Sequence, residues 1–105
     1  MLIDFKDEDF ENKIKKENIS VIQFSASWCS PCKELTPVLE KLSKNFEGKA
    51  TFYYADVEEG GLNKGSELGI RGVPSTILFK RGVEVDRLVG YPGEAKVSEW
   101  LSKNI

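Results

Sequence analysis

Apolar residues recur along this chain with two spacings, and the change between them predicts where strands give way to helices. Ile19–Ser25 (ISVIQFS) is rich in β-branched residues and apolar almost throughout. This pattern is typical of a strand buried on both faces at the centre of an α/β sheet. After Cys32 the apolar positions recur with the period of a helix. That stripe consists of Leu35, Val38, Leu39, Leu42 and Phe46.

Two residues shape this predicted helix. Pro37 lies inside it, lacks an N–H group and clashes with the preceding turn, so we expect a kink there. Gly48 follows the last apolar position. We expect it to end the helix in the left-handed conformation that glycine adopts easily.

The rest of the chain divides into shorter elements. Apolar runs predict strands at Met1–Phe5, Ala50–Val57, Thr76–Phe79 and Val83–Val89. Helices are predicted at Asp7–Glu17 and Glu94–Asn104, with a weakly helical segment at Gly60–Gly69. Between the last two strands, Lys80–Gly82 is a hairpin signal.

The order of these elements is β-α-β-α-β-(α)-β-β-α. It predicts an α/β fold with a central mixed β-sheet of about five strands, flanked on both faces by about four helices. The sheet should be parallel in its early strands and antiparallel in its late ones. Since no repeat, linker or low-complexity tract interrupts the chain, we expect a single domain over residues 1–105.

Charge and composition exclude several classes of function. The 105 residues include 15 basic and 17 acidic side chains, a net charge of −2. The chain therefore lacks the basic footprint of a protein that binds nucleic acid or anionic lipid. No unbroken apolar run approaches the length needed to span a bilayer. Residues 1–10 are acidic and unlike a signal peptide, so we expect a cytoplasmic protein, and we expect it to be monomeric.

The chain has no histidine and only two cysteines, Cys29 and Cys32. The lack of histidine removes Ser-His and Cys-His catalysis and histidine metal sites. A structural zinc site usually needs four N or S ligands, so two cysteines argue against a metal. A purely structural disulfide across so short a loop would restrict the unfolded chain by only about 2 kcal/mol. A Cys-x-x-Cys redox pair is the interpretation that we favour over both.

The cysteine pair falls between the predicted central strand and its helix, where sites form in open α/β sheets. We expect Cys29 at or near the helix N-cap, where free N–H groups and the helix dipole favour a thiolate. Pro31 fits the first turn because its missing N–H costs nothing there. Cys32 lies one turn further on and is expected to face the interior, within reach of Cys29.

These positions predict different roles for the two sulfurs. Cys29 is expected to be an exposed nucleophile of low pKa that attacks a substrate disulfide, after which Cys32 displaces the reduced product. Trp28 adds a large apolar surface beside the reactive sulfur. Lys33 either favours the thiolate or is a solvated helix charge, and both interpretations stay open.

Three sequence motifs occur in an order and at distances that resemble the thioredoxin family: WCSPCK, then GVPS, then TILFKRG. The resemblance covers the whole chain. It implies the thioredoxin fold and a protein-disulfide reductant that works by reversible exchange through Cys29 and Cys32. Thioredoxin reductase would supply the electrons. The implied substrates are peroxiredoxins, methionine sulfoxide reductases and ribonucleotide reductase, and no bound cofactor is expected.

The resemblance also assigns residues to substrate binding. Pro74 matches a family proline that is cis and packs against the disulfide. Val73 would offer its backbone N–H and C=O to an extended substrate segment, as in β-augmentation. Gly72, Val89 and Gly90 match the flat apolar surface around the cysteines, which also includes Trp28.

Three residues depart from the family pattern. Ser30 replaces the usual glycine after the first cysteine, and an altered redox potential is expected, because about 30 mV corresponds to only 1.4 kcal/mol. Gln23 replaces a buried aspartate, and Tyr54 falls at or near the position of its partner lysine. Glutamine cannot act as a base. We hypothesise that a water held by Gln23, or the departing thiolate, accepts the proton of Cys32.

Two other functions are compatible with the same residues. An oxidase or isomerase of the same fold would need an oxidising compartment and a stronger bias towards the thiolate. A binding module without redox activity would use the apolar face around Trp28 and Pro74. The presence of both cysteines argues against that module as the sole role.

Overall fold

The computed structural model describes residues 2–105 and contains five strands, four α-helices and two short 3₁₀ helices. The strands are β1 (Ile3–Asp4), β2 (Ile19–Ser25), β3 (Thr51–Asp56), β4 (Ser75–Lys80) and β5 (Val83–Val89). The α-helices are α1 (Asp9–Asn12), α2 (Ser30–Ser43), α3 (Leu62–Glu67) and α4 (Glu94–Asn104). The 3₁₀ helices are η1 (Ile14–Lys16) and η2 (Lys44–Phe46).

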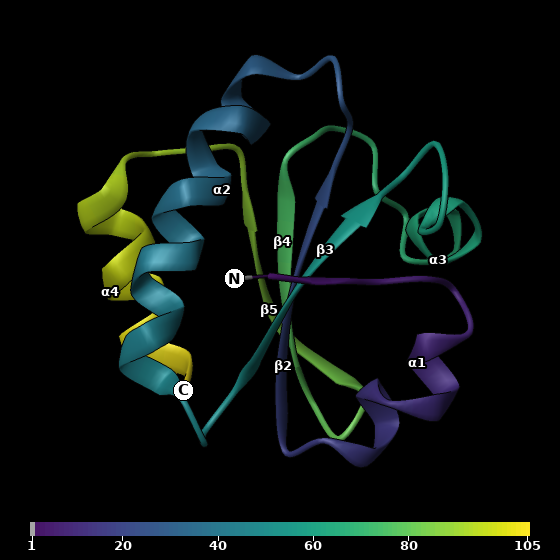
Figure 1. Cartoon of the computed structure of the whole chain (residues 1–105), viewed down its shortest axis with the longest axis horizontal. Coiled ribbons are helices and arrows are strands. Elements are labelled where there is room, and N and C mark those ends of the chain that lie inside the picture. Colours follow the sequence, from purple (N-terminus) through teal and green to yellow (C-terminus); the bar gives the residue numbers. More distant parts are fainter. Residues whose placement is uncertain (1) are drawn as a thin grey trace.

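The strands form one mixed sheet in the order β1-β3-β2-β4-β5. β3 pairs in parallel with β1 and β2, whereas β4 pairs antiparallel with β2 and β5. Helices α2 and α4 lie on one side of the sheet, and α1 and α3 lie on the other (Figure 1). The predicted fold class is therefore confirmed, with β2 in the centre of the sheet and its carboxyl end leading into α2.

Alternation along β2 divides the core into two apolar clusters. Val21 joins the cluster under α2 and α4, whereas Ile22 and Phe24 join the cluster on the opposite face. Both faces of β2 are buried, as its apolar sequence predicts. Gln23 shares the face of Val21 by the same alternation, so its amide is directed towards α2.

The hairpin between β4 and β5 is confirmed. Its two loop residues, Arg81 and Gly82, have φ angles of 53° and 80°, the positive values that a tight two-residue hairpin loop requires. Glycine is needed at position 82 for a second reason. A Cβ atom there would lie 3.1 Å from the Cα of Lys15.

Three sequence predictions need correction. The helix predicted over Asp7–Glu17 is broken at Lys13, whose φ and ψ of −127° and −55° separate α1 from η1. The break leaves Phe10 and Ile14 both buried, so the spacing of these residues does not distinguish one helix from two. The strand predicted over Met1–Phe5 is only Ile3–Asp4 in the described residues, and Met1 lies outside them. Cys29, which was expected to be exposed, is buried in the disulfide form.

The predicted helix after Cys32 forms, but it begins at Ser30 and continues through Pro37. The predicted end of this helix is wrong, because α2 stops at Ser43 and Phe46 belongs to η2. Gly48 follows η2 with a φ of +81°, the left-handed conformation expected of it. Among the helices of residues 2–105, none is long and apolar enough to cross a membrane.

Candidate active site

The first turn of α2 holds the cysteine pair. Cys29 is the N-cap residue, with extended φ and ψ of −89° and 112°, and Ser30 and Pro31 occupy the first two helical positions. The backbone N–H of Cys32 points at the sulfur of Cys29, with an N–S distance of 3.2 Å. An N–H group at a helix start has no partner within its own helix, so here it is directed at the reactive sulfur.

Cys29 and Cys32 form a disulfide, with their Cα atoms 5.3 Å apart. Only 4% of Cys29 and 1% of Cys32 is exposed. The prediction that Cys29 is openly exposed is therefore wrong for the disulfide form. Its sulfur is covered by a loop that is distant in sequence, and its Sγ lies 3.6 Å from the carbonyl oxygen of Val73.

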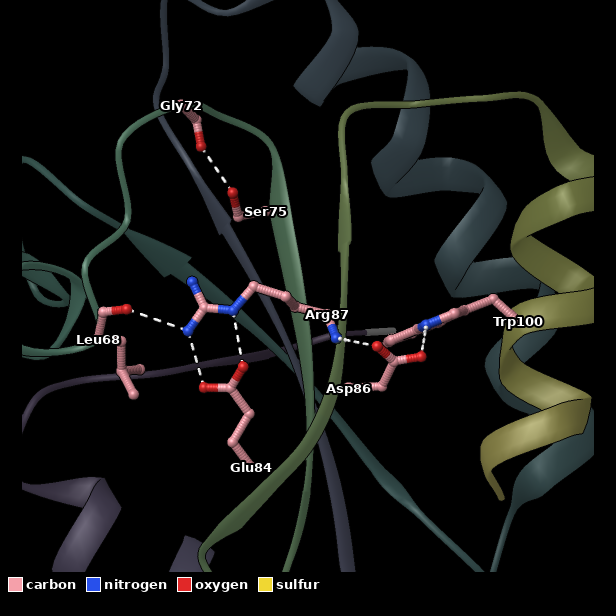
Figure 2. A network of polar contacts seen from close by, with 7 residues as sticks. All are labelled: Leu68, Gly72, Ser75, Glu84, Asp86, Arg87 and Trp100. Carbon is pink, nitrogen blue, oxygen red and sulfur yellow. Dashed lines mark hydrogen bonds and ion pairs between the residues drawn. The ribbon is translucent and has the colours of Figure 1, made fainter.

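That loop leads into β4. The Val73–Pro74 peptide bond is cis, as the resemblance implies, and Pro74 is buried. The hydroxyl of Ser75 donates to the carbonyl of Gly72 at 2.7 Å (Figure 2). The N–H of Gly90 donates to the carbonyl of Pro74 at 2.8 Å. The sequence-predicted residues of this loop are thus brought together with Cys29 and with the end of β5.

Exposed apolar side chains lie beside the disulfide. Trp28 is 65% exposed and Val89 is 67% exposed. The indole N–H of Trp28 donates to Glu58 Oε1 at 2.9 Å. The resemblance assigns substrate docking to Trp28, Gly72, Val73, Pro74, Val89 and Gly90, and we call these residues the docking surface.

Gln23 lies beneath the first turn of α2 and is fully buried. Its side-chain amide nitrogen is 2.8 Å from Ser25 Oγ, 2.9 Å from Thr36 Oγ1 and 3.3 Å from the carbonyl oxygen of Cys32. The Thr36 hydroxyl also lies 2.9 Å from that carbonyl. A neutral network thus ties Cys32 to the central strand.

Thr76 and Tyr54 lie next to Gln23 in the sheet, on β4 and β3. The Thr76 hydroxyl is buried and has no hydrogen-bond partner within residues 2–105. Burial raises the pKa of Tyr54, and the negative charges of Asp56 and Asp4 add to the effect. Tyr54 is therefore a neutral phenol. It supplies no positive charge that could pair with a carboxylate at position 23.

The structure does not bring every predicted residue to the sulfurs. Ser30, Pro31 and Lys33 are exposed, and none of their side chains forms a hydrogen bond or ion pair within the described residues. Sequence reasoning missed Thr36 and Ser25. A signal was available, since a buried glutamine needs hydrogen-bond partners. Thr36 is one helical turn after Cys32, and Ser25 is two residues after Gln23 on the same strand face.

Within residues 2–105, no group of three or more histidine, cysteine or acidic side chains is arranged to hold a metal ion. The chemistry at this site involves the two sulfurs and the groups around them. A Cys-x-x-Cys disulfide at the start of α2, next to a cis-proline loop, defines a thiol–disulfide oxidoreductase with the thioredoxin fold.

Comparison with known proteins identifies the family. The sequence profile of the thioredoxin family matches residues 1–103. Thioredoxin from Rickettsia bellii is 37% identical over 100 residues, which cover 94% of each chain. Thioredoxin from Staphylococcus aureus is 34% identical over 104 residues, covering 99% of this chain and 98% of that one. The chain belongs to the thioredoxin family.

Solved structures agree with this assignment. Plasmodium falciparum thioredoxin superposes with a TM-score of 0.89 and 27% identity, covering all of both chains. A mutant thioredoxin from Halobacterium salinarum gives a TM-score of 0.84 and 27% identity, covering 96% of this chain and 88% of that one. The protein is a redox-active member of this family that exchanges dithiol and disulfide.

Replacing Thr36 by valine tests the neutral network. We expect Thr36→Val to lower the free energy of unfolding of the oxidised protein by about 1–2 kcal/mol, because the buried amide of Gln23 loses an acceptor. Thr36→Ser keeps the hydroxyl and is the matched control. Denaturant unfolding compares the two variants, and equal stabilities would contradict a role for the hydroxyl.

Proposed function

We propose that this protein is a single-domain, monomeric carrier that reduces protein disulfides in the cytoplasm. Thioredoxin reductase would return it to the dithiol form. Its substrates would include peroxiredoxins, methionine sulfoxide reductases and ribonucleotide reductase. One observation supports this proposal above all: the N–H of Cys32 points at the sulfur of Cys29 beside an exposed apolar surface.

The first step is nucleophilic attack by Cys29. In the reduced protein, the N–H of Cys32 and the start of α2 stabilise negative charge on the Cys29 sulfur. This thiolate attacks one sulfur of the substrate disulfide. A bond forms between Cys29 and the substrate, the substrate S–S bond breaks, and the second substrate sulfur leaves as a thiolate.

The second step releases the substrate. Cys32 loses its proton and attacks the Cys29 sulfur, so the bond from Cys29 to the substrate breaks and the Cys29–Cys32 disulfide forms. Two electrons have then passed from the protein to the substrate. The Cα separation of 5.3 Å in the oxidised form lies within the normal range for a disulfide.

Substrate docking would place the scissile disulfide over Cys29. Val73 is half-buried, and its N–H makes no backbone hydrogen bond within the described residues. Its free backbone groups suit an extended segment of substrate that adds alongside the loop. Trp28 and Val89 would flank that segment with apolar contacts, which disfavour water at the reacting sulfurs.

The proton of Cys32 needs an acceptor other than a carboxylate. Gln23 occupies the buried position under Cys32, and its amide cannot take up a proton at neutral pH. The Gln23 amide and the unpartnered Thr76 hydroxyl are polar atoms suited to holding a water molecule there. Such a water, or the departing substrate thiolate, would receive the proton. Because the groups under Cys32 are uncharged, the step would depend on pH mainly through the thiols.

Insulin reduction with dithiothreitol as electron source tests the activity and the roles of the cysteines without a natural reductase. We expect the native protein to accelerate precipitation of the insulin B chain, and Cys29→Ser to abolish that acceleration because the nucleophile is lost. Cys32→Ser keeps the nucleophile but cannot resolve the mixed disulfide. It should accumulate a covalent adduct with insulin that mass spectrometry detects when dithiothreitol is withheld.

The two serine variants serve as controls for each other. If only Cys29→Ser formed the adduct, the order of attack would be the reverse of the one assigned. If both variants formed it, neither cysteine could be assigned as the sole nucleophile. A native protein that left insulin intact would contradict the reductant function itself.

Substituting Gln23 by aspartate tests how the proton is handled. We expect Gln23→Asp to add an ionisation to the pH profile of insulin reduction, because a buried carboxyl has a raised pKa and can accept the Cys32 proton when ionised. Gln23→Glu, which is one methylene longer, is the control for the placement of the carboxyl. Superimposable profiles for native protein and Gln23→Asp would show that position 23 has no part in proton transfer.

A further inference from the structure

The loop that bears Val73 and Pro74 has few hydrogen bonds of its own. It connects α3 to β4, and we call residues 68–74 the docking loop. The N–H groups of Gly69 and Ile70 bond back to α3, and the carbonyl of Pro74 accepts from Gly90. Between these ends, residues 71–73 make no backbone–backbone hydrogen bond within the described chain. The Ser75 hydroxyl bonds the Gly72 carbonyl in the middle of the loop, and the remaining support comes from the two ends.

One end of the docking loop is held by Arg87, which lies on β5. Its Nη2 donates to the carbonyl of Leu68 at 3.0 Å. Its Nη2 and Nε also donate to the two carboxylate oxygens of Glu84, each at 2.7 Å. Figure 2 shows the guanidinium between Glu84 and Leu68, on the side of β5 opposite the contact of Asp86 with Trp100. We call this arrangement of Arg87, Glu84 and the Leu68 carbonyl the Arg87 clamp.

A bulge in the sheet makes the clamp possible. Leu78 pairs with Asp86 and Phe79 pairs with Glu84, so the register skips Val85. The extra residue places Glu84 and Arg87 on the same side of β5 although they are three positions apart. Glu84 can then bind the guanidinium with both oxygens and orient it. The paired carboxylate also raises the pKa of Arg87.

The accepting carbonyl is chemically suited to this contact. Leu68 is the C-cap residue of α3, where helix carbonyls lack partners within the helix and carry a partial negative charge. A guanidinium satisfies such a carbonyl while it keeps its bidentate ion pair. Lysine cannot make both contacts with the same geometry, because its ammonium is a point charge without the planar fork.

The clamp also links two parts of the docking surface. Val89 is the last residue of the strand that bears Arg87, and the N–H of Gly90, the next residue, bonds the carbonyl of Pro74 at the far end of the docking loop. β5 and the residue that follows it thus bond the docking loop at both ends, through Arg87 at Leu68 and through Gly90 at Pro74. The distance between Val73 and the exposed side chain of Val89 is set by these two attachments.

We propose that Arg87, oriented by Glu84, is a positioning residue that holds the docking loop against β5 and thereby places Val73 over Cys29 for protein substrates. This inference rests on the docking role proposed above for Val73 and its neighbours. Arg87 touches neither sulfur. Its loss should therefore weaken the reaction with a protein disulfide and spare the reaction with a small disulfide that needs no docking.

The test compares steady-state reduction of insulin with reduction of the small disulfide 5,5′-dithiobis(2-nitrobenzoic acid). We expect Arg87→Met to raise KM for insulin by roughly 3- to 10-fold, because about one hydrogen bond is lost. The kcat for insulin and the rate with the small disulfide should be unchanged. Arg87→Lys should behave like Arg87→Met. Glu84→Gln keeps an acceptor for Arg87 and should have a smaller effect. Lys96→Met, on the exposed face of α4, removes one positive charge elsewhere and should leave KM unchanged.

Each outcome supports or overturns the proposal. Equal losses with insulin and the small disulfide, or full recovery in Arg87→Lys, would overturn it, because either would assign Arg87 to stability or to charge alone. Thermal unfolding verifies that every variant is folded at the assay temperature. Val89→Ser, at an exposed position of the docking surface, separates the two proposals. If Val89→Ser raises KM and Arg87→Met does not, the clamp is wrong. If neither raises KM, the docking surface itself is wrong.

Discussion

The chemistry of this protein depends on one hydrogen-bond geometry, in which the N–H of Cys32 is directed at the sulfur of Cys29. That geometry exists because a short connection, residues 26–29, leads from β2, which is buried on both faces, into α2 and leaves Cys29 at the N-cap. Pro31 stabilises the first turn without removing a needed donor. The end of β2 thus positions the first turn of α2. The N–H of Cys32 in that turn stabilises negative charge on the Cys29 sulfur.

The groups around the cysteines differ from the family pattern in a consistent way. Gln23 and Tyr54 stand where the resemblance implies a buried acid and its lysine. A neutral pair avoids the cost of leaving one charge unpaired inside the protein. Gln23 donates to the Cys32 carbonyl and to Thr36. Its side chain therefore holds the backbone of Cys32, although it cannot titrate as an aspartate would.

The elements with strong periodicity could be predicted from the sequence. β2, β5 and α4 have the predicted bounds. β2 is buried on both faces and is therefore apolar almost throughout, and α4 buries Val97, Trp100 and Leu101 on one face, which imposes the helical spacing. The break at Lys13 was missed because Phe10 and Ile14 are buried equally well by two short helices. The near burial of Cys29 was missed because its cover, Val73, is 44 residues away along the chain. The Arg87 clamp likewise depends on a bulge that no local pattern indicates.

The most direct measurement is the rate at which iodoacetamide alkylates each cysteine of the reduced protein as a function of pH, with the modified residue identified by mass spectrometry. The account predicts that Cys29 reacts first and that its rate follows a pKa well below the ordinary thiol value of about 8.5. Cys32 should stay protected until the protein unfolds. A Cys29 that reacts no faster than an ordinary exposed thiol, with an unshifted pKa, would contradict the account.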